Sequence, residues 1–204
     1  IKQKFSEDFR RMPAEIKEKY LENFMIKFTY NTNRIEGGTL TLRETANLLK
    51  EGITPREKPI KDVKEAEAHR KVFYLILEHK EDLDLLTVLN WHRLLFEETK
   101  PKIAGRIRDY QVAISGSKVE LPFPAELNSL LTDFFKWYNK NKNKFHPVEL
   151  AALTHLKFVS IHPFGDGNGR ISRLMMNFVL HKHGYPMLNI VYKNRNAYYT
   201  ALER

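Results

Sequence analysis

The residues best suited to chemistry lie close together between His162 and Arg173. Positions 165–169 hold three glycines, so the backbone can turn tightly there and approach a ligand closely. Asp166 supplies one carboxylate in this loop, and a helical pattern follows it. Arg170 and Arg173 are three positions apart and therefore share one helix face. The stretch combines a histidine, a carboxylate and two arginines around a glycine-rich loop.

These residue types suit a ligand with phosphate groups and a metal ion. The free N–H groups at the start of a helix form an anion site, and two arginines can grip phosphoryl oxygens. Asp166 suits Mg²⁺, which takes one or two protein carboxylates and leaves its other positions to phosphate and water. His162 is a natural proton acceptor for an attacking hydroxyl. A plain turn between two helices would explain each residue singly but not the whole set.

The stretch resembles the signature of the Fic family, His-x-Phe-x-Asp/Glu-Gly-Asn-Gly-Arg-x-x-Arg. The matching positions are His162, Phe164, Asp166, Gly167, Asn168, Gly169, Arg170 and Arg173. The resemblance implies an all-α fold, a helical bundle with a short β-hairpin flap over the active site. It also implies protein AMPylation, in which AMP passes from ATP to a serine, threonine or tyrosine hydroxyl of a target protein and pyrophosphate is released.

The resemblance implies a role for each of these residues. His162 would be the catalytic base, and Asp166 would hold Mg²⁺ between the α- and β-phosphates of ATP. Arg170 would hold the β-phosphate and Arg173 the γ-phosphate. The N–H groups of residues 167–169, with the side chain of the asparagine among them, would stabilise charge on the α-phosphate. The implied nucleotide-binding set is Asp166, Gly167, Asn168, Gly169, Arg170, Ile171, Ser172 and Arg173.

A second stretch, Thr32-x-x-x-Glu36-Gly37, resembles the inhibitory motif of the same family. A carboxylate beside Arg173 would occupy the arginine that should hold the γ-phosphate, so we expect Glu36 to inhibit the enzyme. The motif precedes the core, as in the subgroup with an N-terminal inhibitory helix. Two alternatives stay open: Glu36 faces water before a Gly-Gly turn, or it positions water for the removal of AMP from a modified target.

One segment has a strand pattern, at residues 112–114 and 118–121 around a Ser-Gly-Ser turn. It is similar to the Fic flap, which covers the nucleotide and whose exposed edge can bind an extended target segment. Ser117 and Lys118 are the expected nucleotide contacts, against the alternative of a hairpin without a ligand role. Tyr198 resembles a family tyrosine beside the nucleotide base, against the alternative of ordinary helix packing.

Helical periodicity runs through nearly all the rest of the chain. Apolar residues recur every fourth position from Ile16 to Phe28, and the pattern weakens at residues 30–33. Thr41 and Glu44 form a capping-box sequence that begins the next helix. Further helices are expected over residues 60–79, 88–96, 125–139 and 147–161, and after the signature. We divide the chain into an N-terminal helical segment with the inhibitory motif (residues 1–58) and a Fic core (residues 59–204), and we expect the C-terminus to be truncated.

The composition narrows the classes of protein. The 204 residues include no cysteine, so we expect no disulfide, no thiolate metal site and a cytoplasmic location. No apolar run approaches the length of a membrane span, so no membrane partner is expected. A net charge of +9 is compatible with binding to nucleic acid. Solvated basic side chains on the surface and a binding site for nucleotide phosphates explain this charge as well. Nucleic acid is therefore not expected as a partner of this chain, and that partner stays open only for a further domain beyond the C-terminus.

Other functions stay open from the sequence. Transfer of another phosphate-containing group, such as UMP or phosphocholine, would use the same signature with a different nucleotide pocket. A nucleotide-sensing regulator would not need His162 as a base. Homodimers are common in the family, so a homodimer is compatible with the chain. The histidines His69, His79 and His92 have no metal-cluster spacing and are interpreted as surface or core residues, and His155 is interpreted as a packed core histidine, against the alternative of a catalytic partner.

Overall fold

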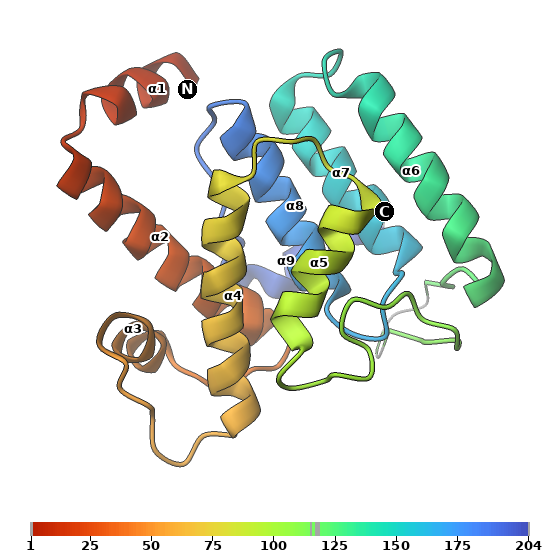
Figure 1. The fold of residues 1–204 in the computed structure, drawn as a ribbon, viewed down its shortest axis with the longest axis horizontal. Coiled ribbons are helices and arrows are strands. Elements are labelled where there is room, and N and C mark those ends of the chain that lie inside the picture. The colour runs from red at the N-terminus through yellow and green to blue at the C-terminus, as the bar shows by residue number, and fades with distance from the viewer. Residues whose placement is uncertain (1, 115, 117–118, 204) are drawn as a thin grey trace.

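The computed structural model describes residues 2–114, 116 and 119–203. This part of the chain consists of helices joined by loops and contains no β-strand (Figure 1). In chain order the α-helices are α1 (Lys2–Arg11), α2 (Ala14–Ile35), α3 (Leu42–Glu51), α4 (Ile60–Glu78), α5 (Leu85–Phe96), α6 (Leu127–Asn141), α7 (Pro147–Ile161), α8 (Asn168–Lys182) and α9 (Arg195–Leu202). Two short 3-10 helices, η1 (Pro124–Glu126) and η2 (Tyr192–Asn194), complete the list. The all-α prediction is confirmed, and none of these helices has the length and apolarity that a membrane span requires.

Helix α8 lies at the centre of the bundle. It contacts α2, α4, α5 and α7, and every residue from position 170 to position 180 is buried. A helix that is buried on all sides must be enclosed by its neighbours, and α7 runs alongside it (Figure 1). This packing holds the junction between α7 and α8, where the predicted signature lies.

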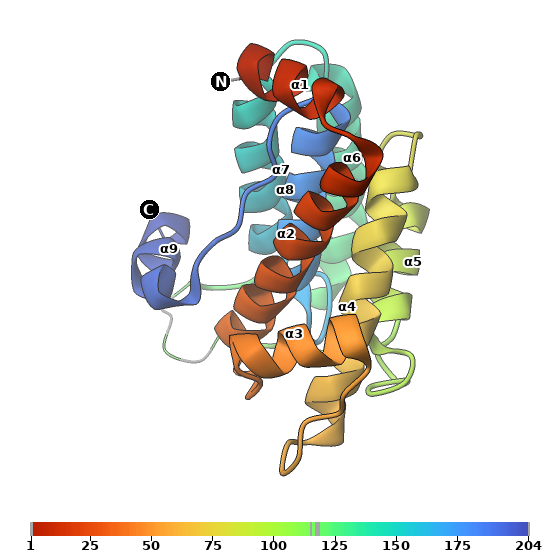
Figure 2. The same cartoon turned by 90° about the vertical axis from the view of Figure 1, so that its left-hand side faces the viewer.

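Helix α2 packs against α4 and α8, and α3 lies across the lower ends of α2 and α4 (Figure 2). The sequence pattern weakens at residues 30–33, but α2 continues through them and ends only at Ile35. A distant contact supports this last turn, because Asn31 Oδ1 accepts a hydrogen bond from the backbone N–H of Tyr192 at 2.8 Å. The added turn brings Glu36, which follows α2 directly, to the first turn of α8.

Local signals for helix ends are confirmed. The Thr41 hydroxyl accepts from the N–H of Glu44, and the Glu44 carboxylate accepts from the N–H of Thr41, so the capping box begins α3. Gly52 ends the same helix with a φ of +70°. Pro147 is the first residue of α7. These ends depend only on sequence neighbours, which is why the sequence predicts them.

The segment between α5 and η1 does not form the expected β-hairpin in its described residues, which are 97–114, 116 and 119–123. Side chains instead join its two arms, which are residues 106–114 and residues 119–123. Gln111 Nε2 donates to the carbonyl oxygen of Leu121 at 3.0 Å, and Arg108 Nη2 donates to that of Pro122 at 2.7 Å. Such bonds hold two arms together without the backbone ladder that defines a strand pair.

Candidate active site

The predicted signature lies where α7 ends and α8 begins. His162 follows α7 with φ 51° and ψ 56°, a left-handed conformation that is uncommon for a residue with a Cβ. Gly167, with a φ of +86°, redirects the chain so that α8 begins at Asn168. The Asn168 carboxamide closes the loop, since Oδ1 accepts from the N–H of Phe164 at 2.9 Å and Nδ2 donates to its carbonyl at 2.8 Å. The loop is therefore held in shape by its own residues.

The hydrogen bond of His162 determines which ring nitrogen can act as a base. Nδ1 lies 3.2 Å from the carbonyl oxygen of Val159, which can only accept, so Nδ1 carries the proton and Nε2 keeps a lone pair. Burial lowers the pKa of His162, against the opposing effect of the Val159 carbonyl. The ring is therefore neutral at physiological pH, with Nε2 able to accept a proton.

A buried histidine of α5 supports the same loop from outside. His92 Nδ1 accepts from the backbone N–H of Gly105 at 2.9 Å, so Nε2 carries the proton and donates to the carbonyl oxygen of Asp166 at 2.9 Å. The ring stacks on Phe164 with 3.7 Å between the centroids. Burial lowers the pKa of His92 to about 4, so the ring stays neutral. His92 is thus a core histidine whose hydrogen bonds position the loop.

Replacing His92 with phenylalanine is expected to lower the free energy of unfolding by about 2–4 kcal/mol, because the Asp166 carbonyl and the Gly105 N–H lose their partner. Chemical denaturation would measure the change. His69→Phe is a matched control: His69 is also buried, but Nδ1 alone has a partner, Thr29 Oγ1, within the described residues. A loss for His92→Phe no larger than the loss for His69→Phe would contradict this role.

Arg108 ties the loop after α5 to the signature. Its side chain is buried, and Nε donates to the carbonyl oxygen of His162 at 2.9 Å. Its backbone N–H donates to the carbonyl oxygen of Pro163 at 2.9 Å. Because Nη2 also bonds to Pro122, one arginine connects His162 to both arms of the segment between α5 and η1.

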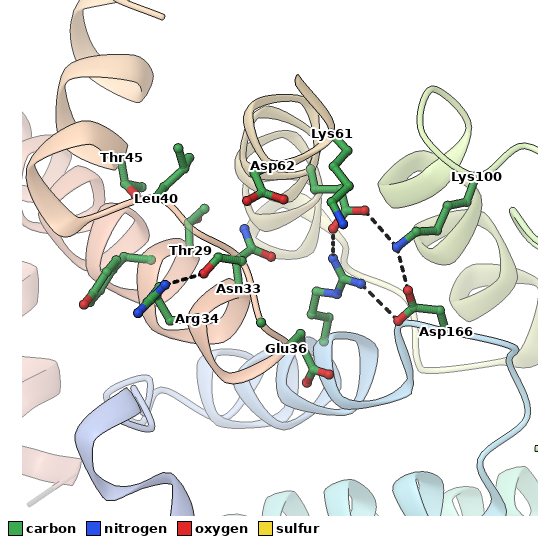
Figure 3. A pocket seen from close by; sticks show the side chains of 15 residues that line it. Thr29, Asn33, Arg34, Glu36, Leu40, Thr45, Lys61, Asp62, Lys100 and Asp166 are labelled. Atoms are coloured by element: carbon green, nitrogen blue, oxygen red, sulfur yellow. Dashed lines mark hydrogen bonds and ion pairs between the residues drawn. The ribbon is translucent and has the colours of Figure 1, made fainter. Parts of the chain in front are cut away.

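Asp166 belongs to a closed group of four charged side chains (Figure 3). Its carboxylate lies 2.5 Å from Lys100 Nζ and 3.2 Å from Arg170 Nη2. Glu65 of α4 pairs with both cations and lies 3.0 Å from Lys100 Nζ. Burial alone would raise the pKa of Asp166, but Arg170, Lys100 and the N–H of Gly167 outweigh burial and lower it. Asp166 is therefore ionised.

Arg173 is buried and hydrogen-bonded through all three of its nitrogens. Nη2 lies 2.5 Å from Glu36 Oε1, Nε donates to Thr32 Oγ1 at 2.7 Å, and Nη1 donates to Tyr198 Oη at 3.2 Å. Burial opposes the charge, but the Glu36 carboxylate raises the pKa of Arg173 overall. The Glu36 side chain is 28% exposed and that of Arg173 only 1%, so a ligand that approaches Arg173 from solvent meets Glu36 first.

Tyr198 extends these bonds to His155. Because Tyr198 Oη accepts from Arg173, its own proton goes to His155 Nε2, 2.9 Å away. Burial lowers the pKa of His155 to about 3, so the imidazole is neutral and can accept. The hydroxyl of Tyr198 thus supports Arg173, and His155 is a buried residue that supports Tyr198.

Gly169 leaves the space that the Glu36 carboxylate fills. A Cβ at Gly169 would collide with Glu36 Oε1 and would lie 3.0 Å from Arg173 Nη1. The carboxylate therefore lies against the first turn of α8, where the helix start also offers its N–H groups to an anion.

Comparison with known proteins agrees with this geometry. The Fic/DOC family profile matches residues 82–180. A Fic domain-containing signaling protein from Bacteroides thetaiotaomicron has the same fold, with a TM-score of 0.90 and 32% identity, and the match covers 98% of this chain and 79% of that one. The chain belongs to the Fic family.

Longer Fic proteins of animals are also similar. The proteins named protein adenylyltransferase Fic from Nematostella vectensis and Aedes aegypti are 34% and 36% identical to this chain over 95% and 92% of its length. The chain spans only 45% and 37% of the length of these two relatives. Their name describes the longer proteins, and its transfer to this Fic chain is a proposal.

Asp166 is the candidate Mg²⁺ ligand of this Fic protein. The part of the chain that the structure describes holds no group of three or more His, Asp or Glu side chains that could bind a metal by itself. Mg²⁺ does not need such a group, since phosphate and water complete its coordination. The ionised Asp166 carboxylate, whose side chain is 37% exposed, fits that mode of binding.

The other nucleotide contacts expected from the Fic signature and flap have different surroundings. Ser117 and Lys118 lie outside the described residues. Ile171 is fully buried in the core, and the Ser172 hydroxyl donates to a backbone carbonyl within α8 at 2.9 Å. The side chains of these two residues therefore stabilise the helix and its packing. The N–H groups of residues 168–170 have no partner within the helix, so they are the ones that can bind a ligand.

Four residues of the Fic site are not singled out by the sequence pattern, namely Glu65, His92, Lys100 and Arg108. Each reaches the signature across a long sequence separation, 66 residues for Lys100 and 74 for His92. The one local sign was for His92, which falls on the apolar face of its helix and was therefore a candidate for burial.

Proposed function

We propose that this Fic protein transfers AMP from ATP to a serine, threonine or tyrosine hydroxyl of a target protein and releases pyrophosphate. The observation that carries the proposal is the neutral His162 ring, whose Nε2 keeps a lone pair beside a helix start with two arginines. The reaction requires a base for the hydroxyl and an anion site for the nucleotide. The names of the longer relatives support the same activity.

The residues divide the work of the reaction. His162 Nε2 takes the proton of the target hydroxyl while that oxygen forms its bond to the α-phosphorus of ATP. The bond from the α-phosphorus to the oxygen that bridges to the β-phosphate breaks, and pyrophosphate leaves. The N–H groups at the start of α8 stabilise charge on the α-phosphate, and Arg170 and Arg173 hold the β- and γ-phosphates. Asp166 would hold Mg²⁺, which when bound would neutralise charge on the phosphates.

Glu36 is proposed to inhibit this reaction. Two observations support this role: Glu36 forms an ion pair with Arg173, and its carboxylate fills the space beside Gly169. The nucleotide phosphates would need both the Arg173 side chain and that space. Residues 1–58 then act as a regulatory segment on a core of residues 59–204. The segment that Arg108 ties to His162 is proposed to cover the nucleotide, with Ser117 and Lys118 as contacts.

The donor nucleotide tests the activity directly. Incubation of the Glu36→Gly protein with ATP labelled on the α-phosphate should leave label on protein, whereas label on the γ-phosphate should leave with pyrophosphate. Label from the γ-phosphate on protein would indicate phosphorylation instead. Label from UTP or from a phosphocholine donor, without label from ATP, would indicate a different transferred group. Nucleotide binding with no label from any donor would favour a nucleotide sensor.

Removal of AMP from a modified target is the second candidate. The observation that favours it is the Glu36 carboxylate beside the same loop, where it could orient a water molecule. A target that already carries AMP would distinguish the two activities. Release of AMP by the parent protein, and its loss in Glu36→Gln, would assign the removal activity to this site.

The rate of AMP transfer should depend on the protonation of His162. Burial lowers the pKa of His162 below its usual 6.5, and the neutral form is the active base. Activity of the Glu36→Gly protein should therefore rise with pH along a limb whose midpoint lies below 6.5, and it should be level at pH 7–8. Initial rates measured at saturating ATP would give this profile. A midpoint above 6.5 would contradict a neutral base at physiological pH.

A further inference from the structure

A small charged cavity lies beside the signature loop, lined by residues of α2, α4 and α8 (Figure 3). Its volume is about 160 Å³. Among the charged side chains that line it are Lys61, Glu65, Lys100, Asp166 and Arg170. Asp166, the candidate metal ligand, is therefore reached through a space in which other charges compete for it.

Lys100 occupies one of the two carboxylate oxygens of Asp166. Its Nζ lies 2.5 Å from Asp166 Oδ2 and 3.0 Å from Glu65 Oε1, so it bridges two carboxylates. The other oxygen, Asp166 Oδ1, accepts from the N–H of Gly167 at 2.5 Å and from Arg170 at 3.2 Å. Oδ2 is consequently the oxygen that a metal ion would take, and Lys100 is the group already on it.

The two cations on Asp166 differ in how easily they can be exchanged. The Arg170 side chain is 4% exposed and is also paired with Glu65. The Lys100 side chain is 32% exposed and belongs to the loop after α5. If Lys100 leaves Asp166, it keeps its ion pair with Glu65, so neither the Lys100 ammonium nor the Glu65 carboxylate is left unpaired. A cation that enters the cavity can thus replace Lys100 and leave Arg170 in place.

We propose that Lys100 is a resident counter-ion of Asp166, which Mg²⁺ displaces onto Glu65 when the nucleotide binds. The inference rests on the function proposed above, in which Asp166 holds Mg²⁺. In the metal-free protein Lys100 orients the carboxylate. Because it must leave Oδ2 before a metal can bind there, Lys100 sets the Mg²⁺ concentration that the protein requires and acts as a positioning residue.

The dependence of ADP binding on Mg²⁺ tests this inference without a measurement of activity. ADP has no γ-phosphate, so its binding does not need Arg173, which Glu36 occupies. Calorimetric titration of ADP into the full chain at a series of Mg²⁺ concentrations gives the affinity for ADP at each one. The measured quantity is the Mg²⁺ concentration at which half of the Mg²⁺-dependent increase in ADP affinity is reached. For Lys100→Met we expect this concentration to fall about five-fold, because no ion pair has to be broken at Oδ2.

Two lysine variants separate displacement from a general effect of charge. Lys61 lines the same cavity but forms no ion pair within the described part of the chain, so Lys61→Met should stay within about two-fold of the parent. Lys100→Arg keeps the charge and should need at least as much Mg²⁺ as the parent. An unchanged or higher requirement in Lys100→Met, or an equal fall in Lys61→Met, would overturn the inference.

Asp166→Asn tests the metal site itself and should remove most of the Mg²⁺ dependence. If this variant keeps the parental dependence, or if the parent shows none, the metal role in the proposed function fails and the Lys100 inference fails with it. If Asp166→Asn loses the dependence while Lys100→Met behaves as the parent, the metal role stands and only the Lys100 inference is overturned.

Discussion

Replacing His162 with asparagine or alanine is expected to slow AMP transfer by about 10²–10⁴-fold while ATP still binds. The loss follows because Nε2 is the atom that would accept the target proton, since Nδ1 is committed to Val159. ATP binding should remain because the arginines and the helix start that hold phosphate belong to other residues. Labelling with α-labelled ATP in the Glu36→Gly background, together with ATP affinity by calorimetry, would measure both quantities.

Asparagine and alanine test different aspects of this residue. His162 has a φ of 51°, which strains alanine, whereas asparagine tolerates the left-handed region and can still donate to Val159. His146→Ala is the matched control at the other end of α7, where His146 Nδ1 accepts from the N–H of Val148 at 3.3 Å. Parental labelling by His162→Asn, or an equal loss in His146→Ala, would contradict the assignment of the base.

Glu36→Gly is expected to raise AMP transfer or self-labelling by about 10- to 100-fold. In the parent protein the Glu36 carboxylate lies 2.5 Å from Arg173 Nη2, one of the groups proposed to hold the γ-phosphate. A phosphate must either separate a carboxylate from a buried arginine or bind without that arginine, and both reduce productive binding. Initial rates of incorporation from α-labelled ATP, at low and at saturating ATP, would measure the effect.

Glu36→Gln separates the charge of this side chain from its size. The amide can still accept from Arg173, so its labelling should fall between those of the parent and Glu36→Gly. Glu36→Gly leaves Arg173, whose side chain is 1% exposed, without a counter-charge, so its Tm should fall without nucleotide and recover when ATP is added. Equal labelling by all three proteins, or label that persists after His162→Asn is added, would contradict the inhibitory role.

The helical framework could largely be predicted because its signals are local. The capping box of Thr41 and Glu44 and the proline at position 147 act within a few residues, and the structure confirms both. The end of α2 could not be predicted in this way. Its last turn is polar, and it is supported by a hydrogen bond from Tyr192, which lies 161 residues away in sequence.

The hairpin prediction was wrong for the described residues for a related reason. The strand pattern at residues 112–114 requires a partner strand with matching backbone groups, and its own composition cannot supply one. The buried Arg108 and the side chain of Gln111 bond to carbonyls of the opposite arm and hold the two arms together instead. Strand propensity is a weak guide where buried side chains can satisfy the backbone.

The sequence by itself determined the chemistry available between His162 and Arg173. The sequence places a base and a carboxylate just before a helix, and it places two arginines one turn apart on one face of that helix. This arrangement holds in any fold that forms a helix there. Only the tertiary structure decided what surrounds them: Lys100 on the carboxylate, His92 behind the loop, and Glu36 against Arg173 across 137 residues of sequence. Such contacts arise because α2, α4 and α5 pack around the buried α8. Packing between helices that are distant in sequence leaves no local pattern in the chain.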